Sequence, residues 1–156
     1  MKYLKYVRID ERLIHGQVLI KWLKENRSNA VIIVDNILDE NPILKSVMQK
    51  SLPQGCQLEV FGCEAGIEFL KKTEFRNLPF ILIRDVAMLE VLEKAGIMFE
   101  QINIARLPYA MGKDEICEKV YMDKKEQKLM RRLMNSSRIY VQMVPDSEVV
   151  WLKDVL

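Results

Sequence analysis

Short runs of β-branched and aliphatic residues alternate with longer amphipathic segments along the whole chain. The runs cover residues 4–9, 30–34, 57–61, 79–83, 101–104 and 138–144, and residues 116–121 form a seventh candidate. Several runs are apolar at nearly every position, which is typical of parallel strands covered on both faces. Strands that alternate with helices pair into parallel sheets through right-handed crossovers. We therefore predict an α/β fold, a three-layer α/β/α sandwich with a mostly parallel central sheet.

Helix signals occupy the intervals between these runs. Apolar residues recur at helical spacing after Gly16 and again after Asn41-Pro42, which reads as an N-cap followed by proline at the first helical position. Asp123 and Glu126 resemble a capping box that opens another helix, and residues 64–73 and 86–95 complete the set. The predicted buried stripes of three helices are Val18, Leu19, Trp22 and Leu23; Ile43, Leu44, Val47 and Met48; and Leu129, Met130, Leu133 and Met134.

The composition fits one globular domain, residues 1–156, with 49% hydrophobic and 29% charged residues. The balance of 24 Lys and Arg against 22 Asp and Glu does not demand a polyanionic partner. No run approaches the roughly 18 apolar residues of a membrane span, and Lys5 would interrupt the apolar core of a signal peptide. Three cysteines without CxxC spacing indicate free, buried thiols in a reducing compartment, so we expect a cytoplasmic protein.

Polar residues follow the apolar runs where each predicted strand ends. The carboxyl ends of parallel strands meet at one edge of a sheet, which is where ligands bind in open α/β folds. We therefore expect one polar rim made by Asp10, Asp35-Asn36, Gly62, Arg84-Asp85 and Asn103.

His15 is the only histidine, and it lies in the connection between the first strand and the first helix, where residues 8–18 read RIDERLIHGQV. Neutral imidazole is a good nucleophile near pH 7, because its ordinary pKa is about 6.5. Attack on a phosphoryl group gives a phosphohistidine, whose labile P–N bond can pass the group onward. The position of His15 favours this role of phosphoryl-accepting nucleophile over the alternative of a structural or surface histidine.

Three neighbours of His15 suit phosphoryl transfer. Arg12 offers a planar fork of donors to two phosphoryl oxygens, a geometry that lysine cannot copy. Gly16 lets backbone N–H groups approach an anion where the helix begins. Asp10 either orients the loop by pairing with Arg12 or holds the imidazole through one nitrogen, and the sequence leaves both roles open. The alternatives are that Arg12 is an ordinary ion-pair partner of Asp10 or Glu11, and that Asp10 is a turn former.

The run RIDERLIHGQV followed by Trp22 closely resembles the motif of the IIB subunits of the bacterial sugar phosphotransferase system (PTS), in the mannose/fructose/sorbose class. Eleven contiguous positions match in type and order, and the resemblance extends over the whole chain. Residues 144–146, Val-Pro-Asp, are similar to the family's C-terminal strand end. One departure follows Asn103, where the family often has glycines and this chain has Arg106. That arginine is either a second cation for the phosphoryl group or one half of a surface salt bridge.

The resemblance implies a function as well as a fold. In such proteins the histidine matched by His15 is phosphorylated, the arginine matched by Arg12 assists the transfer, and the aspartate matched by Asp10 belongs to the same loop. Proteins of this class receive the phosphoryl group from phosphohistidine on a IIA partner. They pass it to a sugar imported through the membrane subunits IIC and IID. No metal or organic cofactor is implied, and the implied fold is the α/β/α sandwich with a mostly parallel sheet.

Other functions have less support in the sequence. The main alternative is a IIB-like regulatory module that senses sugar supply through phosphorylation of His15. Nucleotide binding lacks both GxxxxGK[ST] and a GxGxxG after the first strand, and a zinc site lacks ligand spacing. Nucleic-acid binding lacks a basic stripe, since the cations of residues 124–132 read as the solvated face of the last helix. The apolar residues Val149, Val150 and Trp151 either pack onto their own domain or serve a homo-oligomer contact.

Overall fold

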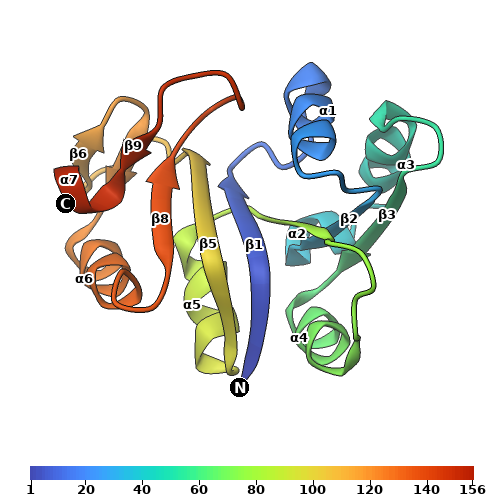
Figure 1. The fold of residues 1–156 in the computed structure, drawn as a ribbon, viewed down its shortest axis with the longest axis horizontal. Helices are drawn as coiled ribbons and strands as arrows, with labels where there is room; N and C mark the ends of the chain where they lie inside the picture. The colour runs from blue at the N-terminus through green and yellow to red at the C-terminus, as the bar shows by residue number, and fades with distance from the viewer.

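The computed structural model describes all residues 1–156 and contains a seven-stranded sheet with the strand order β3-β2-β4-β1-β5-β8-β9. Every neighbouring pair is parallel except β8 and β9, which are antiparallel. The first strand therefore lies in the middle of the sheet, between β4 and β5. Figure 1 shows it next to β5. The strands are β1 (Lys2–Asp10), β2 (Ala30–Val34), β3 (Gln57–Phe61), β4 (Phe80–Ile83), β5 (Ile97–Arg106), β8 (Arg138–Val141) and β9 (Val150–Trp151).

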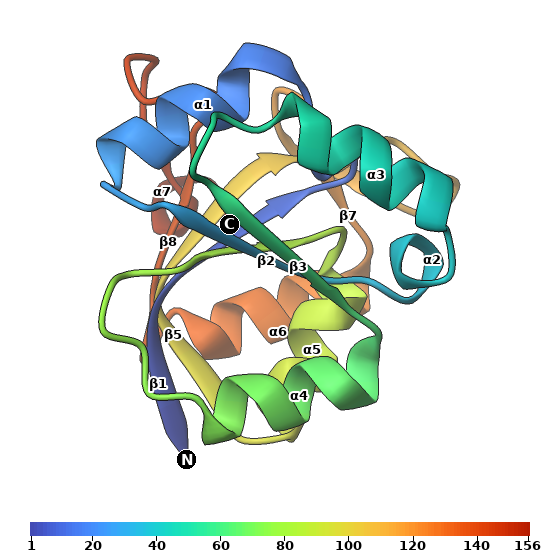
Figure 2. The ribbon, with the colours of Figure 1, turned by 90° about the vertical axis from the view of Figure 1, so that its right-hand side faces the viewer.

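Helices cover both faces of this sheet, so the predicted three-layer sandwich is confirmed. Figure 2 shows α1 (Gly16–Glu25) and α3 (Pro42–Ser51) on one face, and α4 (Cys63–Lys72), α5 (Val86–Lys94) and α6 (Lys124–Leu133) on the other. Two separate cores result. The α1 face buries Tyr6, Trp22 and Phe80 with nine smaller neighbours, whereas the opposite face buries a larger cluster around Ile9, Ile83 and the apolar sides of α4 to α6.

The predicted helix starts agree with the observed caps. Asn41 accepts a hydrogen bond from the Leu44 N–H at the start of α3, and Asp123 and Glu126 form both halves of a capping box at the start of α6. The stripe of α1 is also buried at Leu19, Trp22 and Leu23, while Val18 is half-buried. Local capping chemistry, which the sequence displays directly, therefore locates these helix boundaries.

The predicted buried face of α3 is wrong. Only Met48 is buried, whereas Ile43, Leu44 and Val47 are 80%, 36% and 57% exposed. The helix lies at the end of the sheet beside β3 and has too little sheet surface beneath it to cover its whole apolar stripe (Figure 2). Periodicity identified the helix correctly, but it could not show how much surface the neighbouring elements offer.

Residues 116–121 do not form one strand. They belong to a small antiparallel hairpin outside the main sheet, made by β6 (Asp114–Cys117) and β7 (Val120–Met122). Lys119 has φ 65° in the turn between them, so the chain reverses at the charged pair Glu118-Lys119. The run 138–144 also ends early, at Val141, and the short elements α2 (Asn36–Asp39), β9 and α7 (Leu152–Val155) carried no recognised signal.

The C-terminal segment packs onto its own domain. Trp151 pairs with Tyr140 across β8 and β9, with ring centroids 5.6 Å apart, although it remains 40% exposed. The three cysteines are free, as expected, but each is half-buried rather than buried. The cations of α6, including Lys124, Lys128 and Arg132, face solvent as predicted.

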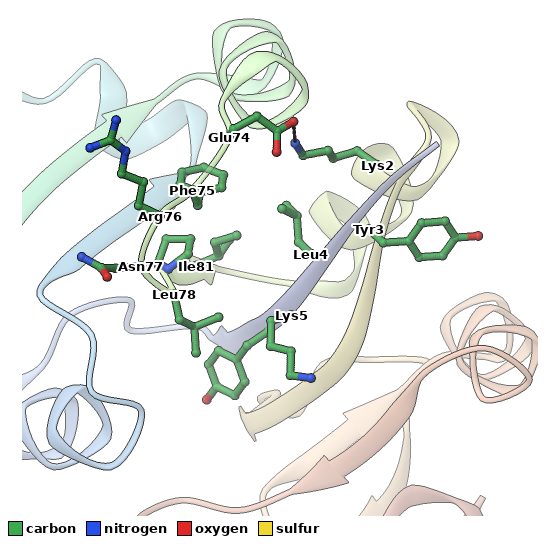
Figure 3. Close-up of a pocket in the computed structure, with 12 residues that line it drawn as sticks. Lys2, Tyr3, Leu4, Lys5, Glu74, Phe75, Arg76, Asn77, Leu78 and Ile81 are labelled. Carbon is green, nitrogen blue, oxygen red and sulfur yellow. Dashed lines mark hydrogen bonds and ion pairs between the residues drawn. The ribbon is translucent and has the colours of Figure 1, made fainter.

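A cavity of about 330 Å³ lies at the amino-terminal end of β1 (Figure 3). It exists because β4 begins only at Phe80 and pairs with Val7–Ile9, so no strand runs beside the first residues of β1 on that side. Leu4, Phe75 and Leu78 line it, and Lys2 forms an ion pair with Glu74 at its edge. Parallel strands carry their ligand sites at the opposite, carboxyl edge, so this cavity is separate from the predicted rim.

Asp35 and Arg84 join three connections at that carboxyl edge. Asp35 caps α2 by accepting a 2.8 Å hydrogen bond from the Leu38 N–H, and it accepts two more, of 2.8 and 2.9 Å, from the Arg84 guanidinium. Arg84 also donates to the Glu11 carbonyl, 3.2 Å away, in the loop after β1. The rim therefore contains Asp10, Asp35 and Arg84 as predicted, whereas Asn103 lies within β5 and its side chain is buried.

The Asp35–Arg84 pair predicts an acid-sensitive contribution to stability. Burial opposes ionisation of Asp35, but the bonds from Arg84 and Leu38 outweigh it and lower the pKa of Asp35 below its ordinary value. The stabilisation is thus present above about pH 4 and is lost as the pH falls through the lowered pKa. We expect Asp35→Asn to reduce the free energy of unfolding by roughly 1–3 kcal/mol at pH 7, measured by urea denaturation.

The matched control is Asp39→Asn, which removes a half-exposed ion pair with Lys45. Exposed pairs contribute about 0–1 kcal/mol, so this variant should stay close to wild type. An Asp35→Asn deficit that did not shrink as the pH was lowered from 7 toward 2 would contradict the assignment, because protonation of Asp35 removes the same charge from the wild type.

Candidate functional site

His15 is presented on a short loop that joins β1 to α1. It is the residue immediately before the helix, with extended backbone, and its side chain does not cap the helix. Gly16 has φ 47° and Leu13 has φ 56°, both in the left-handed region, which is costly for the leucine. The Leu13 N–H donates to the Asp10 carbonyl at 2.9 Å and closes the turn. The loop is therefore held in one tight shape that leaves the first N–H groups of α1 unbound by any side chain.

Asp10 is the centre of the site, at the end of β1, with its side chain only 1% exposed. Its Oδ1 accepts hydrogen bonds from the Arg12 backbone N–H at 3.1 Å and from the Arg12 Nε at 3.2 Å. Arg12 Nη2 also donates to Oδ2 at 3.4 Å. Asp10 thus orients the loop by pairing with Arg12, which was one of its two predicted roles.

The other predicted role of Asp10 is also met in part, because its Oδ2 lies 3.5 Å from Nε2 of His15. Nε2 is fully enclosed and has no well-aligned hydrogen-bond partner, whereas Nδ1 is not enclosed in this way. The imidazole side chain as a whole is 28% exposed. One nitrogen of the ring therefore faces the buried carboxylate, and the other belongs to the part of the ring that is exposed to solvent.

The surroundings of His15 favour its neutral form. Partial burial disfavours the imidazolium most, and the positive charges of Arg12 and Arg8 act in the same direction. Asp10 opposes them, but the net effect lowers the pKa of His15 below 6.5. The ring is consequently uncharged, with a free lone pair, across the neutral pH range.

Two further arginines lie at the edge of the site. Arg106 forms an ion pair with Glu11, with 2.8 Å between Nε and Oε1, which is the salt-bridge alternative predicted for it. Arg84 reaches the same loop through the Glu11 carbonyl. Arg84 and Arg106 each pair with a carboxylate, as Arg12 does with Asp10. The Nη1 group of Arg12 makes no hydrogen bond, and the Arg12 side chain is 33% exposed.

Sequence reasoning missed Arg8 as a part of this site. Its guanidinium is 2% exposed and lies 3.8 Å from the Asp10 carboxylate. Arg8 opens the recognised motif, and a charged residue inside an otherwise apolar strand was the available signal. Its bonding partners, Asn103, Gln142 and Met143, are 95 to 135 residues away along the chain and could not be inferred from spacing.

No group of three or more histidine, cysteine, aspartate or glutamate side chains is arranged to hold a metal ion. None of the helices is both long enough and apolar enough to cross a membrane.

Comparison with known proteins gives consistent relatives along nearly the whole chain. It is 28% identical over 150 residues to the N-acetylgalactosamine-specific phosphotransferase enzyme IIB component 2 of Escherichia coli K12, with 96% of each chain covered. It is 29% identical over 127 residues to the sorbose-specific EIIB component of Lacticaseibacillus casei, covering 81% of this chain and 77% of the relative.

Solved structures agree with these relatives. The crystal structure of manxB from Thermoanaerobacter tengcongensis matches with a TM-score of 0.86 and 28% identity, covering 99% of this chain and 94% of the other. The IIBSor domain of the sorbose permease from Klebsiella pneumoniae has the same fold, with a TM-score of 0.85 at 21% identity and 99% and 95% of the two chains covered.

The family model of the PTS system sorbose subfamily IIB component matches residues 4–156, which include the His15 loop and the whole sheet apart from the first two residues of β1. This chain therefore belongs to the sorbose subfamily of PTS IIB components, the phosphotransferases of sugar uptake.

Proposed function

We propose that this chain is a cytoplasmic phosphoryl carrier, which accepts a phosphoryl group on His15 from phosphohistidine of a IIA protein. It then transfers the group to a sugar that enters through IIC and IID membrane subunits. Residues 1–156 act in this proposal as one IIB domain. The observation that carries it is the geometry of His15, a neutral imidazole with one reachable nitrogen beside the unoccupied donors of Arg12.

The geometry favours Nδ1 of His15 as the phosphoryl acceptor. A neutral imidazole carries its proton on one nitrogen, and here Nε2 faces the carboxylate of Asp10, which stabilises an N–H there. The lone pair is then on Nδ1, at the reachable side of the ring. In the transfer, a bond forms between Nδ1 and phosphorus while the bond from phosphorus to the donor histidine breaks. Asp10 also stabilises the positive charge that the ring acquires.

Arg12 is placed to stabilise the transferring group. Phosphoryl transfer needs positioning and positive charge at the phosphoryl oxygens more than covalent help. Two donors of Arg12 hold Asp10, and its Nη1 group remains available to an oxygen of the incoming anion. The N–H groups at the start of α1 add a second set of donors at the same place.

The first prediction from this mechanism concerns the labelled atom. After incubation with phosphorylated IIA protein, we expect one acid-labile phosphate per chain, and Nδ1-phosphohistidine in ¹⁵N and ³¹P NMR spectra. His15→Ala should fold and take no label. Label retained by that variant would refute the proposal, and label on Nε2 would refute the assigned orientation of the ring.

The second prediction concerns Arg12. Loss of one contact to the transition state typically costs on the order of 10²–10³ in rate, so we expect a decrease of this size for Arg12→Ala in rapid-quench transfer from the IIA protein. Arg12→Lys keeps the positive charge without the planar fork of donors, so its transfer rate should lie between those of the wild type and Arg12→Ala. Equal rates for Arg12→Ala and the wild type would remove Arg12 from the mechanism.

The third prediction concerns the pKa of His15. Because burial and the cation of Arg12 lower it, the acid limb of the transfer rate should lie below pH 6.5. An NMR titration of the ring should show the pKa rising in Arg12→Ala, where a positive charge is lost, and falling in Asp10→Asn, where a negative charge is lost. Shifts in the opposite directions would show that other groups determine the pKa of His15.

A further inference from the structure

Arg8 is a buried arginine that reaches across the sheet. It leaves β1, passes Asn103 on the neighbouring strand β5, and ends beneath the segment that follows β8. Its Nη1 donates to the side-chain oxygen of Asn103 and to the Gln142 carbonyl at 3.0 Å, and its Nη2 donates to the Met143 carbonyl at 2.8 Å. No carboxylate is within hydrogen-bond distance, so most of its bonding capacity goes to two consecutive backbone carbonyls.

Those carbonyls open a compact loop, residues 142–147, which we call the Met143 loop. The Gln142 side chain closes it by donating to the carbonyls of Pro145 and Ser147, each at 2.9 Å. Trp22 of α1 donates its indole N–H to the Met143 carbonyl at 2.9 Å. The central carbon of the Arg8 guanidinium lies over the Trp22 ring, 4.9 Å from the ring centroid. Arg8 and Trp22 therefore share one acceptor and anchor this loop to both β1 and α1.

The Met143 loop in turn contacts Arg12. The Arg12 Nη2 group lies 3.3 Å from the Met143 sulfur and 3.4 Å from the Asp10 carboxylate, so these two groups hold it from two directions. Arg8 contacts both of them, through the Met143 carbonyl and through its ion pair with Asp10. A lysine at position 8 would keep the charge near Asp10, but it could not donate in a fixed fork to two carbonyls and an amide oxygen.

We propose that Arg8 is a positioning residue for phosphoryl transfer, which anchors the Met143 loop and thereby holds the Arg12 guanidinium beside His15. Its role in catalysis rests on the function proposed above, whereas its effect on Arg12 does not. Arg8 itself is too deeply buried to contact the phosphoryl group, so its action passes through Met143 and Asp10.

The test uses Arg8→Lys, Met143→Leu and a control, Arg138→Lys, which replaces an exposed arginine on β8. Three measurements are made on each folded variant: the side-chain Nε–H NMR signal of Arg12, amide hydrogen exchange in the Met143 loop, and rapid-quench transfer from the IIA protein. Displacing a catalytic group by about 1 Å can cost on the order of 10²-fold. We therefore expect Arg8→Lys to lower the maximal rate by roughly tenfold or more, with little change in the half-saturating IIA concentration.

Arg8→Lys should also shift the Arg12 signal and speed exchange in the loop. Met143→Leu keeps the carbonyl and loses the sulfur. It should therefore shift the Arg12 signal, leave loop exchange unchanged, and reduce the transfer rate less than Arg8→Lys does. Arg138→Lys should match wild type in all three. If Arg8→Lys does not fold, Trp22→Phe removes the other anchor of the same carbonyl and should reproduce its three effects.

An Arg8→Lys variant with wild-type rates, or with a wild-type Arg12 signal and loop exchange, would overturn the proposal, because a retained charge would then be enough. If the wild type takes no label on His15, the proposed function fails instead. The Arg12 signal and the loop exchange still decide in that case whether Arg8 positions Arg12.

Discussion

The site depends on a carboxylate buried at the end of a central strand. Asp10 is almost fully enclosed, and an isolated charge there would carry a large desolvation penalty. The side chains of Arg12 and Arg8 surround it, together with the Arg12 backbone N–H and the His15 imidazole. Each of these groups is consequently held in place by the need to compensate one charge. The reactive ring, the cation and the turn of the loop thus share a single buried partner.

Packing and a backbone hydrogen bond explain why the loop adopts unfavourable backbone angles. A leucine in the left-handed region costs of order 1 kcal/mol, and it persists only where the surroundings determine the conformation. At Leu13 the side chain is buried in the α1 core and the N–H is bonded to the Asp10 carbonyl. Packing and hydrogen bonding together therefore outweigh the local strain and place His15 directly before the helix.

Much of this arrangement could be predicted from the sequence, because it depends on local signals. Strand runs, caps at Asn41 and Asp123, and the spacing of Asp10, Arg12 and His15 are all visible in short windows. What could not be predicted depends on distant packing. The exposed stripe of α3 reflects how little sheet lies beneath it, and the partners of Arg8 come from β5 and the Met143 loop. The reversal at Lys119 falls on the charged pair Glu118-Lys119, and it was missed because the turn lacks the glycine that usually marks a left-handed position.

The charge balance of the site suits the proposed carrier, which would both receive and release a phosphoryl group. The two ion pairs at the rim, of Arg84 with Asp35 and of Arg106 with Glu11, are neutral overall. Arg8 and Arg12 around Asp10 leave one net positive charge beside a neutral ring. A phosphoryl group carries about 1.5 to 2 negative charges near pH 7, so this excess attracts the group without fully neutralising it. An additional free arginine would bind the phosphorylated state more tightly and slow the transfer of the phosphoryl group to the sugar. Catalysis requires stronger interaction with the transition state than with the carrier's resting states. The commitment of Arg84 and Arg106 to carboxylates keeps the site near this balance.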